Sequence, residues 1–115
     1  MAFFLLDTWV VLKGKEEENE EVVRQILQYG RHHPDIFKHV KSLRCFKQSI
    51  GGKPPGMYVL ITEFASLSDM EDFLRKIKVG GEWKQIEQKW KEVMDQSSIE
   101  SIIWSDMFRE LWTEK

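Results

Sequence analysis

Five residues near the middle of the chain have types that could bind a transition metal. They are His32, His33, Asp35, His39 and Cys45. Imidazole, carboxylate and thiolate groups are all metal ligands, but the spacing is poor, because adjacent histidines in an extended segment point in opposite directions. We therefore expect no metal. The simpler interpretation places His32 and His33 at the end of the first helix, where a cationic side chain suits the helix dipole. A role for this pair in a pocket, donating or accepting a proton, stays open.

The sequence motifs of common enzyme classes are absent. There is no Gly-x-Ser-x-Gly nucleophile elbow and no Gly-Lys-Ser/Thr phosphate loop. The glycine-rich segment 51–56 contains two prolines, which lack the amide donors that a phosphate cradle needs, so we interpret it as a hairpin tip. The acidic segment 16–21 is interpreted as a solvated helix start. These segments identify no reaction.

Charge and cysteine content narrow the possible partners and the compartment. Seventeen basic and nineteen acidic side chains leave a net charge of −2, which argues against a nucleic-acid partner. The apolar segment 1–12 is interrupted by Asp7 and Thr8, is too short to span a bilayer and lacks the features of a signal peptide. Cys45 is the only cysteine, which fits a reducing compartment. We expect a cytoplasmic protein with no membrane partner.

The elements that must position any site begin with a strand that is apolar on both faces. The segment 3–12 is rich in aromatic and β-branched residues. Alternation in a strand places Phe4, Leu6 and Val10 on one face and Leu5 and Trp9 on the other. Since both faces are mainly apolar, each must be covered. Helices can cover one face, and we expect a second copy of the chain to cover the other.

The remaining pattern predicts the element order βαββαβ in one domain, residues 1–115. A helix over 16–29, stopped by Gly30, is followed by a more polar edge strand over 42–50 and a strand over 57–64. Helical spacing over 66–79 and 82–95, interrupted by Gly80 and Gly81, predicts two helices or one kinked helix. After residues 96–98, a strand is expected over 99–107, and an apolar tail containing Phe108, Leu111 and Trp112 should dock on the sheet or on a partner.

This order, with a His-Pro step between the first helix and the second strand, resembles the ferredoxin-like dimeric α/β-barrel superfamily. That superfamily includes antibiotic biosynthesis monooxygenase-like proteins and haem-degrading monooxygenases. The resemblance implies an α+β fold with an antiparallel sheet, helices on one face and a homodimer. Haem-degrading members depend on a histidine on the second helix. The corresponding segment 68–95 contains no histidine, so we expect no cofactor.

The resemblance also implies a pocket for a small aromatic ligand, as in the cofactor-independent monooxygenases of the superfamily. The residues that could line it are Trp9, His32, His33, Tyr58, Trp83 and Trp104. Asp7, Arg44 or a histidine could orient a substrate hydroxyl. Each aromatic residue has the alternative of being plain core. Two hypotheses therefore stand: a protein that binds an apolar or aromatic ligand and has monooxygenase-like chemistry, and a non-catalytic dimerisation module.

Overall fold

The computed structural model describes residues 2–107, and the expected docking of the tail around Phe108, Leu111 and Trp112 lies outside them. The elements follow the predicted order, with two helices in the second helical region. Their bounds are β1 Phe3–Val11, α1 Glu16–His32, β2 Ser42–Lys47, β3 Met57–Phe64, α2 Leu67–Ile77, α3 Gly81–Val93 and β4 Met94–Ser105. No helix within the described residues is long and apolar enough to cross a membrane.

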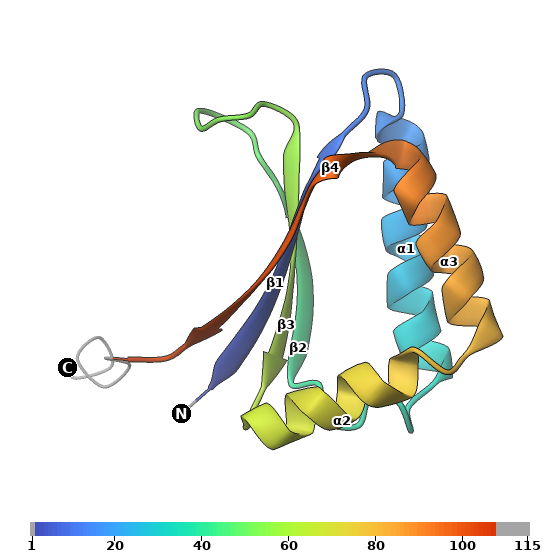
Figure 1. The fold of residues 1–115 in the computed structure, drawn as a ribbon, viewed down its shortest axis with the longest axis vertical. Helices are drawn as coiled ribbons and strands as arrows, with labels where there is room; N and C mark the ends of the chain where they lie inside the picture. The colour runs from blue at the N-terminus through green and yellow to red at the C-terminus, as the bar shows by residue number, and fades with distance from the viewer. Residues whose placement is uncertain (1, 108–115) are drawn as a thin grey trace.

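The four strands form one antiparallel sheet with the order β2-β3-β1-β4. β2 therefore lies at an edge, as its polar sequence predicted. α1 and α3 run side by side over one face of the sheet, and α2 crosses the end of this layer (Figure 1). The predicted ferredoxin-like α+β fold is confirmed.

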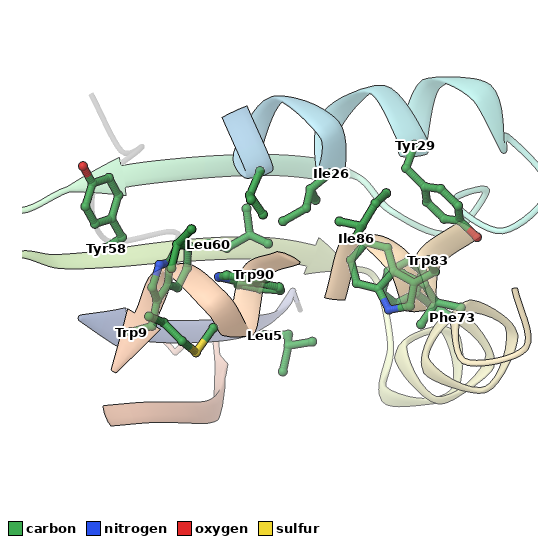
Figure 2. Packing of buried hydrophobic residues seen from close by; sticks show 14 of the residues in the cluster. Leu5, Trp9, Ile26, Tyr29, Tyr58, Leu60, Phe73, Trp83, Ile86 and Trp90 are labelled. Carbon is green, nitrogen blue, oxygen red and sulfur yellow. The ribbon is translucent and has the colours of Figure 1, made fainter. Parts of the chain in front are cut away.

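The face of the sheet toward the helices carries the hydrophobic core. Leu5 and Trp9 of β1 are buried there, as are Tyr58, Leu60 and Phe64 of β3. Side chains of α1 and α3 complete the layer between sheet and helices (Figure 2). Helix propensity alone would not hold these helices, so most of their stability comes from burying their apolar stripes here.

The opposite side of the sheet carries no helix within residues 2–107 (Figure 1). We call this surface the open face. Its apolar members, by strand register, are Phe4, Leu6, Val10, Phe46, Met57, Val59, Ile61, Ile102 and Trp104. Phe46 and Trp104 are 42% and 58% exposed. Both faces of β1 are thus apolar, as its alternation predicted, and one of them remains largely uncovered in the single chain.

Three predicted boundaries were wrong. The second strand, predicted over 42–50, ends at Lys47. Gly30 does not stop the first helix, which continues to His32. A Cβ atom at Gly30 would lie 3.2 Å from the Phe37 ring, so glycine at this position makes room for that ring against the helix.

β4 begins at Met94 rather than at residue 99, and the predicted connection 96–98 lies inside the strand. The register of β4 against β1 shifts between Thr8 and Val10. Ser98 Oγ accepts a hydrogen bond from the Val10 backbone N at 2.9 Å within this irregularity. A polar segment that resembled a turn is therefore a bulge, which tertiary pairing stabilises.

Candidate functional site

The aromatic candidates from the sequence lie at separate places in the fold. Trp9 and Tyr58 stack with their ring centroids 5.8 Å apart, at one end of the core (Figure 2). Trp83 lies at the other end and packs against Tyr29 at 5.4 Å. Trp104 lies on the open face, on the other side of the sheet. These side chains therefore do not form one pocket.

The two histidines lie at the end of α1. His33 is the C-terminal cap residue, and its Nδ1 donates to the Tyr29 carbonyl oxygen at 2.9 Å, while its ring stacks on Tyr29 at 4.0 Å. His32 is exposed beside a shallow depression between α1 and α3. Within residues 2–107, no group of three or more histidine, cysteine or acidic side chains could hold a metal ion. Apart from its helix-end contacts, His33 has its Nε2 3.8 Å from Glu82 Oε2 of α3.

A cavity lies between the sheet and helices α2 and α3, and we call it the sheet–helix cavity. It has a volume of about 350 Å³. Its lining residues are Leu5, Asp7, Ile26, Phe37, Leu43, Leu60, Thr62, Phe73, Leu74, Ile77, Lys78, Trp83, Glu87, Trp90, Lys91, Met94, Ile99 and Ser101. Trp83 is the one residue from the six predicted site positions that lines it. A cavity of this size holds a ligand of one or two rings.

The floor of the cavity contains one carboxyl group, on β1. Asp7 lies at a position of β1 that faces the helices, opposite Leu60 of β3 and Ser101 of β4. Ser101 Oγ donates a hydrogen bond to Asp7 Oδ1 at 2.6 Å. Burial raises the pKa of Asp7 above its ordinary value, and the Ser101 hydrogen bond offsets part of that rise by favouring the charged form. Asp7 is thus a partly buried carboxyl group in mainly apolar surroundings.

The cavity opens to solvent at the β4 edge. Ile99 and Ser101, which line it from that strand, are exposed. The cavity is also lined by three exposed charged residues, Lys78, Glu87 and Lys91. Besides Asp7, two cationic side chains and one anionic side chain therefore line a mainly apolar cavity.

Sequence reasoning identified Asp7 and Trp83 but missed Thr62, Trp90 and Ser101. A signal for Asp7 was present, since a charged residue occupies the strand face that also carries Leu5 and Trp9. No comparable signal existed for Ser101, because its relation to Asp7 depends on a strand pairing across 94 positions of sequence. Trp90 Nε1 has no hydrogen-bond partner within the described residues. Its ring meets Trp9 edge to face at 4.9 Å.

Asp7→Asn is expected to stabilise the unliganded protein at neutral pH. The folded-state pKa of Asp7 is raised, so the folded chain binds this proton more tightly than the unfolded chain. Asp7 therefore lowers stability progressively as the pH rises from the unfolded-state pKa through the folded-state pKa. Asn removes that cost and can still accept from Ser101. We expect the melting temperature to rise by about 4 °C at pH 7.5, corresponding to about 1 kcal/mol.

The pH dependence of this gain checks its cause. Thermal unfolding followed by circular dichroism from pH 7.5 downward should show the advantage of Asp7→Asn shrinking as Asp7 becomes protonated in the wild type. Asp35→Asn, an exposed position in the turn before β2, is the matched control. A gain that is constant with pH, or equal for the two variants, contradicts the electrostatic explanation.

Comparison with known proteins shows the fold. No protein-family model and no curated protein matches the sequence. A NIPSNAP family protein from Agrobacterium tumefaciens superposes with a TM-score of 0.73 at 17% identity, over 95% of this chain and 96% of that one. A candidate antibiotic biosynthesis monooxygenase from Nitrosomonas europaea gives 0.68 at 12% identity, over 94% and 92%. A NIPSNAP domain protein from Burkholderia xenovorans gives 0.68 at 15% identity, over 93% and 96%.

These similarities extend over almost the whole described chain. They agree with the predicted resemblance to antibiotic biosynthesis monooxygenase-like proteins and add the NIPSNAP proteins to it. Because one fold hosts many chemistries, the similarity assigns no reaction, and function must be argued from the site.

Proposed function

We propose that this chain is a single ferredoxin-like domain that forms a homodimer, with each subunit binding a small apolar or aromatic molecule in the sheet–helix cavity. The observation that supports this proposal is the cavity itself, about 350 Å³ in volume with the Asp7 carboxyl group on its floor. Ligand sites typically combine an enclosed apolar space of this size with a few polar groups that orient the ligand. Trp83, Trp90 and Phe73 offer aromatic surfaces for stacking on a planar ligand.

The open face supports the dimer. Contiguous exposed apolar surface is typical of interaction sites in proteins of this size. Phe46 of β2 and Ile102 and Trp104 of β4 are exposed there, on the two edge strands of the sheet. The same face of a second copy would cover them. In a two-fold symmetric dimer each subunit contributes the same surface, so no other partner is needed. The Arg44 guanidinium lies 4.7 Å from the centroid of the Phe46 ring. The open face is therefore partly charged at β2. The apolar centre lies over the other three strands.

A cofactor-independent monooxygenase reaction is the finer form of this proposal. Asp7 is the one lining group on the cavity floor that can accept a proton, and its pKa is raised by burial. Removing a proton from an aromatic hydroxyl would give an electron-rich ring that can itself reduce dioxygen, so the protein supplies only the base and the apolar space. The name of the Nitrosomonas neighbour supports this reaction class as the first to assay.

The non-catalytic dimerisation module is the alternative. It is favoured by the separation of the other titratable groups from Asp7, because Lys78, Glu87 and Lys91 are exposed rather than gathered around it. In that case the open face carries the function and the cavity is incidental. The two proposals differ in one observable, which is the retention of a small molecule.

Native mass spectrometry of the purified full-length chain tests the proposal. We expect a dimer that carries additional small-molecule mass. In Ile99→Trp this extra mass should fall at least about fivefold in occupancy, because the larger side chain narrows the opening at β4. Val79→Trp adds the same ring at a 79% exposed position on the corner between α2 and α3 and should keep it.

The outcomes separate the alternatives. A bare dimer that also fails to bind aromatic probes supports the dimerisation module and contradicts ligand binding. A monomer contradicts the homodimer. Equal retention by Ile99→Trp and Val79→Trp would show that the bound molecule lies outside the sheet–helix cavity.

A further inference from the structure

A groove lies between α1 and the edge strand β2, and we call it the α1–β2 groove. Its volume is about 290 Å³, and it is lined by Glu20, Val23, Arg24, Cys45, Lys47 and Tyr58. None of these residues lines the sheet–helix cavity. Binding in this groove is therefore separate from binding in that cavity.

Tyr58 directs a buried hydroxyl group toward the groove. Its side chain is 6% exposed, and the hydroxyl oxygen has no hydrogen-bond partner within the described residues. Across the sheet, Tyr58 lies between its register partners Trp9 of β1 and Lys47 of β2. The hydroxyl group is at the end of the ring that points away from Trp9 (Figure 2), which is the side of Lys47. A hydroxyl group buried without a partner lacks the hydrogen bonds it would make in water, so an acceptor in the groove would stabilise it.

The charged side chains along the groove are mainly cationic. Lys47 forms no ion pair within residues 2–107, and Arg24 pairs with Glu21 at 2.9 Å on the exposed surface. An exposed pair of this kind contributes little and can exchange for another anion. Burial raises the pKa of the Cys45 thiol, so the thiol stays neutral at pH 7.5 and adds no negative charge. Glu20 is the single anionic residue of the lining.

These groups define the chemistry of a ligand. A phenolic hydroxyl group can donate a hydrogen bond, and guanidinium and ammonium groups donate and carry positive charge. A molecule that meets all three must therefore accept hydrogen bonds and be negatively charged. Phosphate and carboxylate groups have this character. Because Arg24 and Lys47 are exposed, their side chains can turn toward a small anion bound beside Tyr58.

We propose that the α1–β2 groove binds a small oxyanion, a phosphate or a carboxylate group, held by Arg24, Lys47 and the Tyr58 hydroxyl group. Tyr58 contributes the buried donor, and the other two residues contribute positive charge. Glu20 opposes binding, since like charges in one groove repel. The site is independent of the proposed sheet–helix ligand, so either can fail while the other stands.

Thermal unfolding of the purified chain at pH 7.5 tests the site, with sodium phosphate, acetate and chloride compared at matched ionic strength. An anion that binds only the folded chain raises the melting temperature. We expect phosphate or acetate to raise it more than chloride, and a response to one of them alone identifies the group that the site takes. In Tyr58→Phe the dissociation constant should rise at least about tenfold, the value of one hydrogen bond to a charged group.

Matched variants separate the groove from general charge effects. Lys47→Gln should also weaken binding, and Glu20→Gln should strengthen it. Lys53→Gln removes the same charge outside the groove, in the loop between β2 and β3, and should bind as the wild type does. Since the Tyr58 hydroxyl group has no partner in the unliganded chain, Tyr58→Phe should keep the wild-type melting temperature in chloride.

Cys45, the only cysteine, reports where the anion binds. Its reaction with the neutral disulfide 4,4′-dithiodipyridine should slow when the stabilising anion replaces chloride. This protection should be absent in Tyr58→Phe.

Four outcomes would overturn the proposal. The first is an equal melting temperature of the wild type in all three salts. The second is a gain that persists in both Tyr58→Phe and Lys47→Gln, because anions excluded from protein surfaces stabilise folded chains in general. The third is an equal loss of binding in Lys47→Gln and Lys53→Gln, which would assign the effect to net charge. The fourth is unchanged reactivity of Cys45 in an anion that does stabilise the chain, which would place that anion elsewhere.

Discussion

Trp9→Glu is expected to unfold the domain rather than only dissociate a dimer. Trp9 is fully buried on the helix side of β1, where it stacks on Tyr58 and meets Trp90 edge to face. Its Nε1 donates to Asn19 Oδ1 at 2.9 Å. Truncating a core tryptophan costs about 3–5 kcal/mol, and an unpaired buried carboxylate adds several more. That sum approaches the 5–15 kcal/mol that stabilises a typical domain.

The hydrogen bond adds to this loss. Asn19 is fully buried and its Nδ2 has no partner within the described residues, so losing Trp9 leaves the whole amide unsatisfied. Trp9→Phe is the matched control, because it keeps an aromatic ring and removes the indole donor. It should cost about 2–4 kcal/mol and leave a folded protein. Far-ultraviolet circular dichroism and urea unfolding measure both effects. A folded Trp9→Glu variant would show that the assignment of the two faces of β1 is wrong.

The alternation of β1 predicted that both of its faces need cover, but it could not say which face the helices take. That choice depends on how β1 pairs with β3 and β4, which one strand's sequence does not contain. Once paired, Leu5 and Trp9 lie beneath the helices, while Phe4 and Leu6 lie on the open face. The order of helices and strands could be predicted, because it depends on hydrophobic periodicity within short stretches of sequence.

The candidate site residues that were predicted from residue type lie at separate places, because most aromatic side chains of the chain pack in the hydrophobic core. Tyr29 illustrates this, since its ring contacts His33, Phe37 and Trp83 together. The cavity, by contrast, is bounded by residues whose proximity is created by the fold, and Ser101 meets Asp7 only because β4 returns beside β1. Polar residues on an inward strand face, rather than clusters of aromatic residues, were the more informative signal in this sequence.

Trp104→Glu is expected to convert the proposed homodimer into folded monomers. Trp104 is 58% exposed and lies opposite Phe4 in the register of β4 against β1, so its replacement disturbs little of the single chain. In the dimer it would be covered by the second copy. Truncating a central aromatic residue of an interface typically costs about 2 kcal/mol or more of binding free energy. A buried carboxylate in each subunit would add a repulsive pair across the two-fold axis.

We therefore expect the dimer dissociation constant of Trp104→Glu to rise at least about 100-fold, with an unchanged circular dichroism spectrum. Sedimentation velocity over a range of concentrations measures this change. Val79→Glu adds the same charge at the exposed corner between α2 and α3 and should remain dimeric. Trp9→Glu alters the helix side of the same sheet, and Trp104→Glu alters its open face. The first variant should lose the fold, and the second should lose only the dimer. A Trp104→Glu protein that stays dimeric would place the interface elsewhere than on the open face.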